Sequence, residues 1–280
     1  MRRDAGPFDT SRVVRAELTF VSGGGRTLLA RQFVPYPFHI TRPFYLDRAR
    51  PDLATLYLQS AAGGLYRGDD LELALSVNSG GAHVTTQAAT IVHDCGTQPA
   101  VQSTRLSIGE NGFLAYTPDL QVMFPGANLR VEMLVTLKRG ASAVITDGYT
   151  WHDPIGANRI FHQLWQRLDI RDETGRCLVK ETAAVAGSDI VGSSSPIGQY
   201  RAFGSALLLG TPTAMPDTSI IVSECDRLGC LAGSTELPNG AGRLVRCLAP
   251  DGQTLRGVLH TVFEQGFRST VGFAPALRRK

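Results

Sequence analysis

The segment GGLYRGDDLELALSVNSGGAHVTTQAAT, residues 63–90, decides the fold that we expect for the whole chain. Within it, residues 71–77 alternate between apolar and polar side chains, a period of two that is typical of a half-buried β-strand. The turn-forming residues 78–81 follow, and their glycines tolerate the positive φ of a tight turn. Residues 83–88 are rich in β-branched side chains, which suit a pleated surface. The segment therefore predicts a strand, a tight turn and a returning strand.

The same pattern recurs along the chain. Turn glycines lie about thirty residues apart, at Gly81, Gly112, Gly140 and Gly175. Strand-like stretches flank the later turns, namely 104–108 with 113–116, 129–137 with 143–146, and 163–170 with 177–181. Such strand–turn–strand units cannot bury their apolar faces alone, so they must stack on one another. The sequence predicts a mainly β protein of stacked or wrapped hairpins, a β-helix-like scaffold.

The expected organisation is one domain over residues 1–280, with one or two helices near its C-terminal end. Residues 1–12 are expected to be frayed, 13–210 to form the β body, and 211–280 to mix strands with helices. In the β body, 13–20 and 27–34 predict a further hairpin around a glycine-rich turn.

The final third carries the helix signals. Residues 217–228 are compatible with a short helix, and apolar side chains fall at helical spacing at Leu255, Val258, Leu259, Val262 and Phe263. Asp251 is the expected N-cap of this second helix, and Gly266 lies near its expected end. Residues 206–209 and 243–248 are expected to be strands.

Composition narrows the class of protein. The 280 residues include 28 Lys and Arg and 25 Asp and Glu, a net charge of +3, and 43% are hydrophobic. These values are ordinary for a soluble protein with a core, and the basic residues are too scattered for nucleic-acid binding. No apolar run approaches the ~20 residues that span a bilayer, and the basic start of the chain lacks a signal peptide's apolar region. We therefore expect a cytoplasmic protein that binds neither nucleic acid nor membrane.

The five cysteines are expected to be reduced thiols. Their number is odd and they are spread widely, at Cys95, Cys177, Cys225, Cys230 and Cys247. The spacing of the third and fourth differs from the C-x-x-C of zinc and redox motifs, so buried apolar roles are favoured.

A family resemblance follows from the opening segment. It contains a GGL-x-x-GD-x-L run and then G-A-x-x-x-TTQAAT, a pair of motifs that is similar to the signature of the urease accessory proteins called UreD, or UreH in some bacteria. The matching motif residues that we single out are Gly63, Gly64, Gly68, Thr85, Thr86, Gln87 and Thr90. The TLLARQ run near residue 30 and the strand–helix ending also resemble this family.

The resemblance implies a chaperone without a reaction of its own. Such a scaffold would bind urease apoprotein and recruit the accessory protein UreF and, through it, the GTPase UreG, which hydrolyses the GTP. Nickel would then be inserted into the urease active site, with no cofactor held permanently. The C-terminal helix is the candidate UreF-facing surface, and Tyr66 and Phe124 are candidates for the urease side. Plain core packing is an alternative of at least equal weight for these residues.

Two acids are candidates for a polar nickel passage. Asp69 matches the acid of the GD-x-L motif, and Glu181 matches an acid in the strand that the family places after the turn at Gly175. Carboxylate oxygens hold nickel less tightly than imidazole or thiolate, which suits transient binding. For Asp69, an equally weighted alternative is an Asx turn that caps its own loop.

A local metal pair is a further, speculative candidate. His93 and Cys95 would share one face of a strand and could hold a divalent ion between them. A solvent-facing strand end without any metal is the favoured alternative.

Two other function classes stay open. The chain lacks a P-loop GK[ST] and a G-x-S-x-G nucleophile elbow, so we do not expect an enzyme. A small-molecule hydrolase using the loop at His152 and Asp153 is one alternative. A stand-alone structural β-scaffold is the other.

Overall fold

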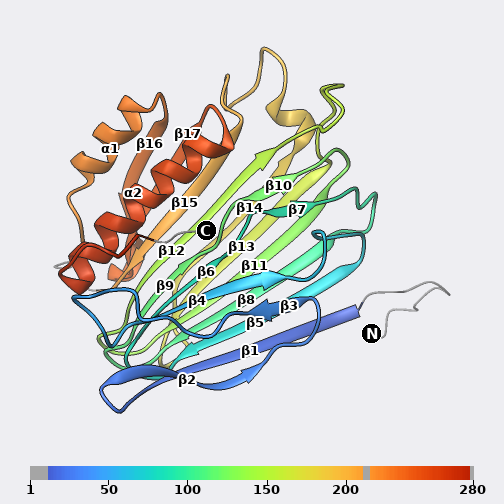
Figure 1. Ribbon diagram of the computed structural model, residues 1–280. Helices are drawn as coiled ribbons and strands as arrows, with labels where there is room; N and C mark the ends of the chain where they lie inside the picture. The colour runs from blue at the N-terminus through green and yellow to red at the C-terminus, as the bar shows by residue number, and fades with distance from the viewer. Residues whose placement is uncertain (1–11, 211–214, 278–280) are drawn as a thin grey trace.

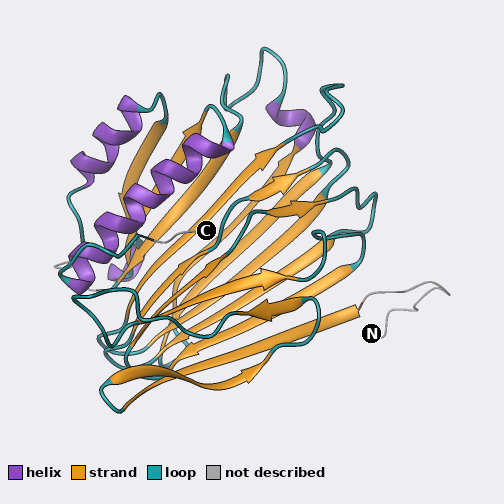
Figure 2. Ribbon diagram, viewed as in Figure 1, coloured by secondary structure: helices purple, strands orange, loops and turns teal. Residues whose placement is uncertain are grey.

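The computed structural model describes residues 12–210 and 215–277. Two large β-sheets face each other, and helices cover the outer face of one of them (Figures 1 and 2). The stretch expected to be frayed lies outside the described residues except for Arg12, which begins the first strand. Within the described ranges, no helix is long and apolar enough to cross a membrane.

Each sheet is ordered by stacking rather than by sequence. The first sheet, sheet A, runs in the order β14 (Cys177–Ala186), β13 (Gln163–Asp172), β11 (Asn128–Leu137), β8 (Ala100–Ile108), β5 (Asp69–Val77), β1 (Arg12–Gly23) and β2 (Arg26–Phe33). Sheet B runs in the order β16 (Leu231–Glu236), β17 (Gly242–Ala249), β15 (Ala202–Leu209), β12 (Ser142–Trp151), β9 (Phe113–Thr117), β6 (Gly81–Thr86), β4 (Ala54–Ser60) and β3 (Phe38–Ile40). Two short strands, β7 (Thr90–Val92) and β10 (Gln121–Met123), form a narrow third side with β12.

The body of the protein is a β-solenoid. The chain passes from β5 in sheet A to β6 in sheet B and β7 on the third side, then repeats the path through β8, β9 and β10 and begins a third coil with β11 and β12. Equivalent strands of successive coils pair in parallel, β5 with β8 and β8 with β11 in sheet A, and β6 with β9 and β9 with β12 in sheet B. The mainly β, β-helix-like scaffold predicted from the sequence is therefore confirmed.

The pairing within the coils differs from the predicted hairpins. The strands on either side of Gly81, Gly112 and Gly140 lie in opposite sheets, so each turn is an arch between sheets and not the bend of a hairpin. Antiparallel hairpins do occur at both edges of sheet A, where β1 pairs with β2 and β13 pairs with β14. A period of two in the sequence indicates only that one face of a strand is buried. Strands in a hairpin and strands joined by an arch both bury one face, so the period cannot distinguish them.

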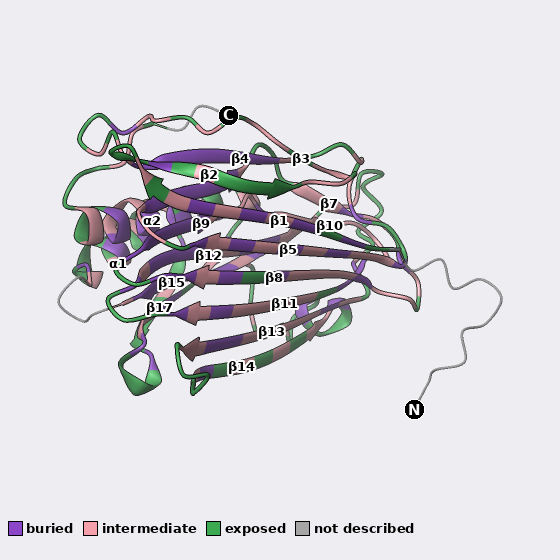
Figure 3. Cartoon of the chain, turned by 90° about the horizontal axis from the view of Figure 1, so that it is seen from below, coloured by how far each residue is buried: buried purple, intermediate pink, exposed green. Residues whose placement is uncertain are grey.

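The largest apolar cluster of the core lies between the sheets, at the arch end. Residues of β5 alternate between buried and half-buried positions, and Leu75 and Val77 face Val84 and Leu114 of sheet B in one apolar cluster. A second cluster closes the opposite end, near the third side, around Val92, Met123 and other residues. Figure 3 shows the contrast between these buried strands and the exposed edge strand β2.

The helices pack on the outer face of sheet B. The predicted short helix is α1 (Thr218–Arg227), capped by Asp217, and the amphipathic helix is α2 (Gly252–Val271), capped by Asp251 as expected. The buried side of α2 contains all five predicted apolar residues. Short 3-10 turns occur at Gly187–Ile190 and Pro238–Gly240.

The predicted end of α2 was wrong. Gly266 lies inside the helix, which continues to Val271 and ends at Gly272 in the left-handed conformation. Gly266 is small because the helix approaches sheet B closely there: a β-carbon on it would lie 2.5 Å from Leu208 Cδ2 and 3.1 Å from Val144 Cγ2.

Candidate functional site

A cavity of about 1260 Å³ runs between the two sheets. Its lining begins at β3 and β4, with Phe38 and Gln59, and ends at β16 and β17, with Leu231 and Leu248. These strands are the two ends of sheet B, so the cavity follows the solenoid axis across the strands. It lies between the apolar clusters that close the arch end and the third side, and we refer to it as the axial cavity.

The sequence signature lines one end of the axial cavity. Gly63, Gly64, Thr86, Gln87 and Thr90 all contribute to the wall there. The hydroxyl oxygen of Thr86 accepts a hydrogen bond from the Asp119 backbone N–H at 2.7 Å, and the Gln87 N–H donates to the Leu58 carbonyl. The motif thus ties neighbouring loops together around an opening between the sheets.

Three other motif-region residues lie outside the cavity lining. Thr85 is buried, and its hydroxyl donates to the Thr117 carbonyl at 2.5 Å. Gly68 has a φ of +75°, which strains any residue with a side chain. Asp69 caps its own loop, because its carboxylate accepts the Tyr66 N–H at 2.8 Å.

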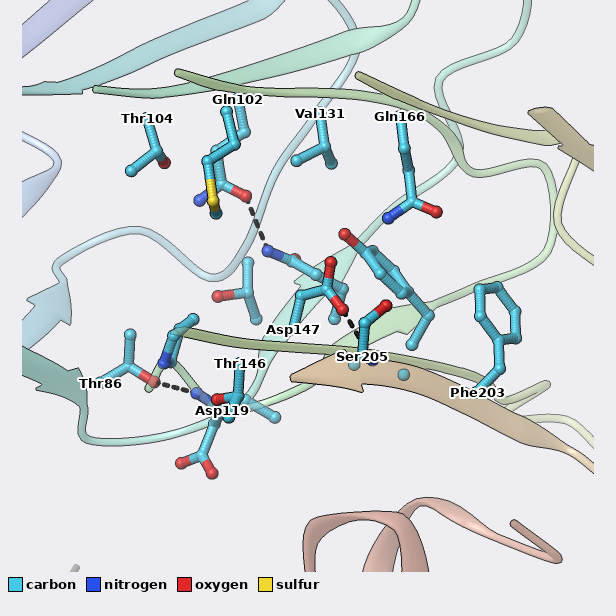
Figure 4. Close-up of a pocket in the computed structure, with 18 of the residues that line it drawn as sticks. Thr86, Gln102, Thr104, Asp119, Val131, Thr146, Asp147, Gln166, Phe203 and Ser205 are labelled. Atoms are coloured by element: carbon cyan, nitrogen blue, oxygen red, sulfur yellow. Dashed lines mark hydrogen bonds between the residues drawn. The ribbon is translucent and has the colours of Figure 1, made fainter. Parts of the chain in front are cut away.

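The middle of the cavity is lined by polar groups from both sheets (Figure 4). Gln102 and Gln166 come from sheet A, and Asp147 and Ser205 face them from sheet B. The Gln121 amide donates to Gln102 Oε1 at 2.7 Å, whereas its own Oε1 atom is buried without a protein partner. A carbonyl-type oxygen that meets no donor from the protein can accept one from a water or coordinate a cation.

Asp147 is the central charged group of the axial cavity. The Ser205 N–H donates to Asp147 Oδ1 at 2.9 Å. Burial raises the pKa of this carboxyl to about 6, and the bonds from Ser205 and the charge of Arg246 offset only part of that rise. At neutral pH most of the carboxyl is ionised, so the cavity holds a negative charge that a cation would neutralise.

Two tyrosine hydroxyls line the same cavity. Burial raises the pKa of Tyr149 well above its ordinary value, with the nearby charge of Asp147 adding to the rise and a hydrogen bond with Gln166 opposing it. Burial also raises the pKa of Tyr116, which bonds with Thr104. Both phenols therefore stay protonated, and they present O–H groups and not charges.

The far end of the cavity carries an ion pair between the sheets. Glu181 on β14 accepts a hydrogen bond from the guanidinium of Arg246 on β17, and both residues line the cavity. The predicted acids Asp69 and Glu181 are not brought together, because β5 and β14 lie at positions separated by β8, β11 and β13 in sheet A. Asp69 is also not among the residues that line the cavity.

His93 and Cys95 point in different directions. The Cys95 thiol is buried and donates to the His93 carbonyl at 3.2 Å. The His93 ring stacks on Tyr66 with centroids 4.4 Å apart, and its contact with Phe124 is edge to face, with centroids 5.6 Å apart. Among the described residues, no cluster of three or more His, Cys, Asp or Glu side chains could hold a metal ion. A two-residue site here stays a prediction.

The loop at His152 and Asp153 does not form a catalytic pair. The Asp153 carboxylate accepts bonds from the Arg159 guanidinium and from the backbone N–H groups of residues 155, 157 and 159. These bonds hold the pKa of Asp153 well below its usual range. The His152 ring instead lies 5.9 Å from that of Phe124.

Asp147 and Arg246 are functional candidates that the sequence analysis missed. A signal was present for Asp147, since it is an acid in the apolar run of β12 and alternates with Ile145 and Tyr149 on one face. No local signal distinguishes Arg246. It becomes a candidate only because Glu181, on β14 of the opposite sheet, faces it. All five cysteines are free, and four are buried as expected. The prediction was wrong for Cys177, which is exposed on the edge strand β14.

Comparison with known proteins confirms the family that the signature resembles. A family model described as UreD urease accessory protein matches residues 13–280. Urease accessory protein UreD 1 of Methylorubrum extorquens (strain PA1) is 47% identical over 271 residues, which cover 96% of this chain and 92% of the relative.

More distant relatives carry the same description. Urease accessory protein UreD 1 of Bradyrhizobium sp. (strain BTAi1 / ATCC BAA-1182) is 42% identical over 96% of this chain and 95% of its own length. The protein of that name from Pseudomonas syringae pv. syringae (strain B728a) is 32% identical, over 98% of this chain and 97% of its own length. The chain belongs to the UreD family of urease accessory proteins, and its role is in urease maturation.

Proposed function

We propose that this protein is a cytoplasmic scaffold that binds urease apoprotein and recruits UreF and the GTPase UreG, and that nickel crosses it through the axial cavity. The chain itself catalyses no reaction and keeps no permanent cofactor, since the GTP is hydrolysed by UreG. The observation that carries the proposal is the axial cavity, which extends from one end of sheet B to the other beside a UreD signature.

The lining suits a cation in transit. Its side chains include the carboxylates of Asp119, Asp147, Glu181 and Asp189, together with amides and hydroxyls. Oxygen ligands bind nickel more weakly than imidazole or thiolate, and a weakly held ion can leave as readily as it enters. A hydrated ion would also find donors and acceptors in Gln121 and Tyr149 for the waters that it carries.

We assign the partner surfaces to exposed side chains of helix α2 and of the third side. Helix α2 buries one side on sheet B and exposes a polar side that includes Arg256 and His260, and we assign this side to UreF. Tyr66, His93 and Phe124 form a cluster of rings at the third side, and we assign this cluster to urease. Tyr66 is 46% exposed, and half-exposed aromatic side chains are enriched at protein interfaces.

A blocked cavity tests the passage. Ala183 on β14 lines the axial cavity between Gln166 and Glu181, so Ala183→Phe would place a ring in the route. The neighbouring exposed residue gives the control, because Thr182→Phe adds the same ring to the same strand outside the lining. Each variant is produced in a strain that lacks its own scaffold, and the urease is purified for metal analysis.

We expect urease matured with Ala183→Phe to contain at least several-fold less nickel than urease matured with Thr182→Phe. Pull-down of UreF and urease should be equal for the two variants, which separates passage from docking. Normal nickel content with the blocked cavity would refute the passage. Loss of pull-down in both variants would instead indicate that β14 is part of a docking surface.

A further inference from the structure

A row of paired residues crosses sheet B along the axial cavity and contains one negative and one positive side chain. Asp147 on β12 lies beside Ser205 on β15, and Ser205 lies beside Arg246 on β17. Gly233 on the edge strand β16 continues this row. All four residues line the cavity, so a guanidinium stands between the central carboxylate and the sheet edge.

The opposite sheet supplies the partner of that guanidinium. Glu181 on β14, the edge strand of sheet A, accepts the bond from Arg246. The Arg246 side chain is 56% exposed and that of Glu181 is 33% exposed. An ion pair with this much exposure contributes little to stability, so it can open at low cost.

Arg246 also acts on Asp147 at a distance. Its positive charge lowers the pKa of the Asp147 carboxyl, whereas the charge of Glu181 raises it. Three charged groups therefore interact along one stretch of the cavity. A guanidinium in that stretch opposes the approach of any other cation.

We infer that Arg246 is an internal counter-cation that closes the Glu181 end of the axial cavity, and that a divalent cation reaches Asp147 from this end only when Arg246 leaves Glu181. This inference rests on the proposed nickel passage and deepens it. While Arg246 is paired with Glu181, the charge of this carboxylate is neutralised, so an entering cation has no free negative charge to bind at this end. Once Arg246 has moved, Glu181 and Asp147 become successive oxygen ligands along the route.

The test is equilibrium binding of Ni²⁺ to the purified full-length protein, without urease. We expect Arg246→Gln to bind Ni²⁺ about tenfold more tightly than wild type, since a positive charge near a partly exposed ion site is removed. The gain should disappear in the double variant Arg246→Gln/Asp147→Asn. Arg246→Lys keeps the charge and should bind like wild type.

Arg130→Gln is the matched control. It breaks an exposed ion pair with Glu132 whose side chains are 47% and 35% exposed, close to the values of the Arg246 pair, and neither residue lines the cavity. This variant should leave Ni²⁺ binding unchanged. Thermal unfolding of all variants reports any purely structural role of the ion pair separately from binding.

The outcomes distinguish this inference from the function on which it rests. If Arg246→Gln binds like wild type while Asp147→Asn binds more weakly, the counter-cation is refuted and the passage stands. If neither substitution changes Ni²⁺ binding, both are refuted. If Arg246→Gln does not fold, Arg246→Met takes its place, since it removes the same charge: about tenfold tighter binding supports the inference, and binding like wild type overturns it.

Discussion

At the scale of single residues, Asp147 shows a conflict between stability and function. Asp147 lies in the middle of β12 and points into the cavity, so its carboxylate loses hydration when the protein folds. Among the described hydrogen bonds, only Ser205 donates to this carboxylate. An apolar or amide side chain would fold at lower cost there. A carboxylate at this position therefore lowers stability, as expected of a residue retained for the proposed cation passage and not for the core.

Replacing this carboxylate tests how much it lowers the free energy of unfolding. The folded-state pKa of about 6 exceeds the ordinary value of 3.8, so the folded protein binds more protons between these pH values and loses stability as pH rises through them. Asp147→Asn removes that loss. We expect it to stabilise the protein by about 1–2 kcal/mol at pH 7.5 and to have little effect at pH 4.

Urea unfolding of both proteins at pH 4, 5, 6 and 7.5 measures the difference. Asp226→Asn, at an exposed carboxylate of α1, is the control and should follow wild type. Parallel stability curves for wild type and Asp147→Asn would contradict the raised pKa. In the wild-type protein, Ni²⁺ binding should also strengthen between pH 5 and 7 as protons leave this carboxyl.

At the scale of elements, helix α2 depends on a close approach to sheet B. Phe263 and Phe267 pack edge to face with centroids 5.6 Å apart, and Phe267 meets Phe113 of β9 at 5.5 Å. The backbone comes nearest at Gly266, against Leu208 and Val144. The glycine that resembles a helix terminator in the sequence is therefore a packing residue.

Two alanine substitutions in the same helix separate packing from helix propensity. Gly257 is exposed and a β-carbon there meets nothing within 4 Å, so Gly257→Ala should stabilise the protein by about 0.5–1 kcal/mol through propensity alone. Gly266→Ala has the same propensity gain but forces Leu208 to shift, and we expect its stability to fall below that of Gly257→Ala by about 1–2 kcal/mol. Equal stabilities in urea unfolding would contradict the close approach.

At the scale of the whole molecule, the solenoid leaves edges and apolar surface uncovered. β2 and β16 are edge strands, and Phe33 and Leu231 on them are 57% and 56% exposed. Ile220 on α1 is 49% exposed. Unpaired strand edges with exposed apolar side chains favour aggregation unless a partner covers them.

Expression of the chain with and without UreF tests this point. We expect the protein expressed alone to be mostly insoluble, and co-expression with UreF to move it to the soluble fraction as a complex that a pull-down recovers. Co-expression with an unrelated soluble protein is the control. A stable, soluble monomer that is indifferent to UreF would instead favour a stand-alone structural scaffold.

Much of the fold could be predicted from the sequence because its signals are local. The alternation in β5, the Asp251 cap and the apolar stripe of α2 each depend on neighbours a few residues away. The GGL-x-x-GD-x-L and TTQAAT motifs identified the family in the same way. Asp69 showed the limit of such evidence, since its motif position is explained by its bond to the Tyr66 N–H.

The sequence by itself determined that this is a stacked β protein of the UreD family, because periodicity, turn residues and motifs survive without any knowledge of which strands meet. Only the tertiary structure decided that the turns at Gly81, Gly112 and Gly140 join strands of opposite sheets, whereas the turn at Gly175 joins neighbours in one sheet. Parallel stacking places Val131 between Gln102 and Gln166 in sheet A. Antiparallel pairing aligns Asp147, Ser205 and Arg246 in sheet B, and the facing of the two sheets brings Arg246 to Glu181. These residues are tens of positions apart, so their meeting depends on the register between coils, which no local pattern encodes.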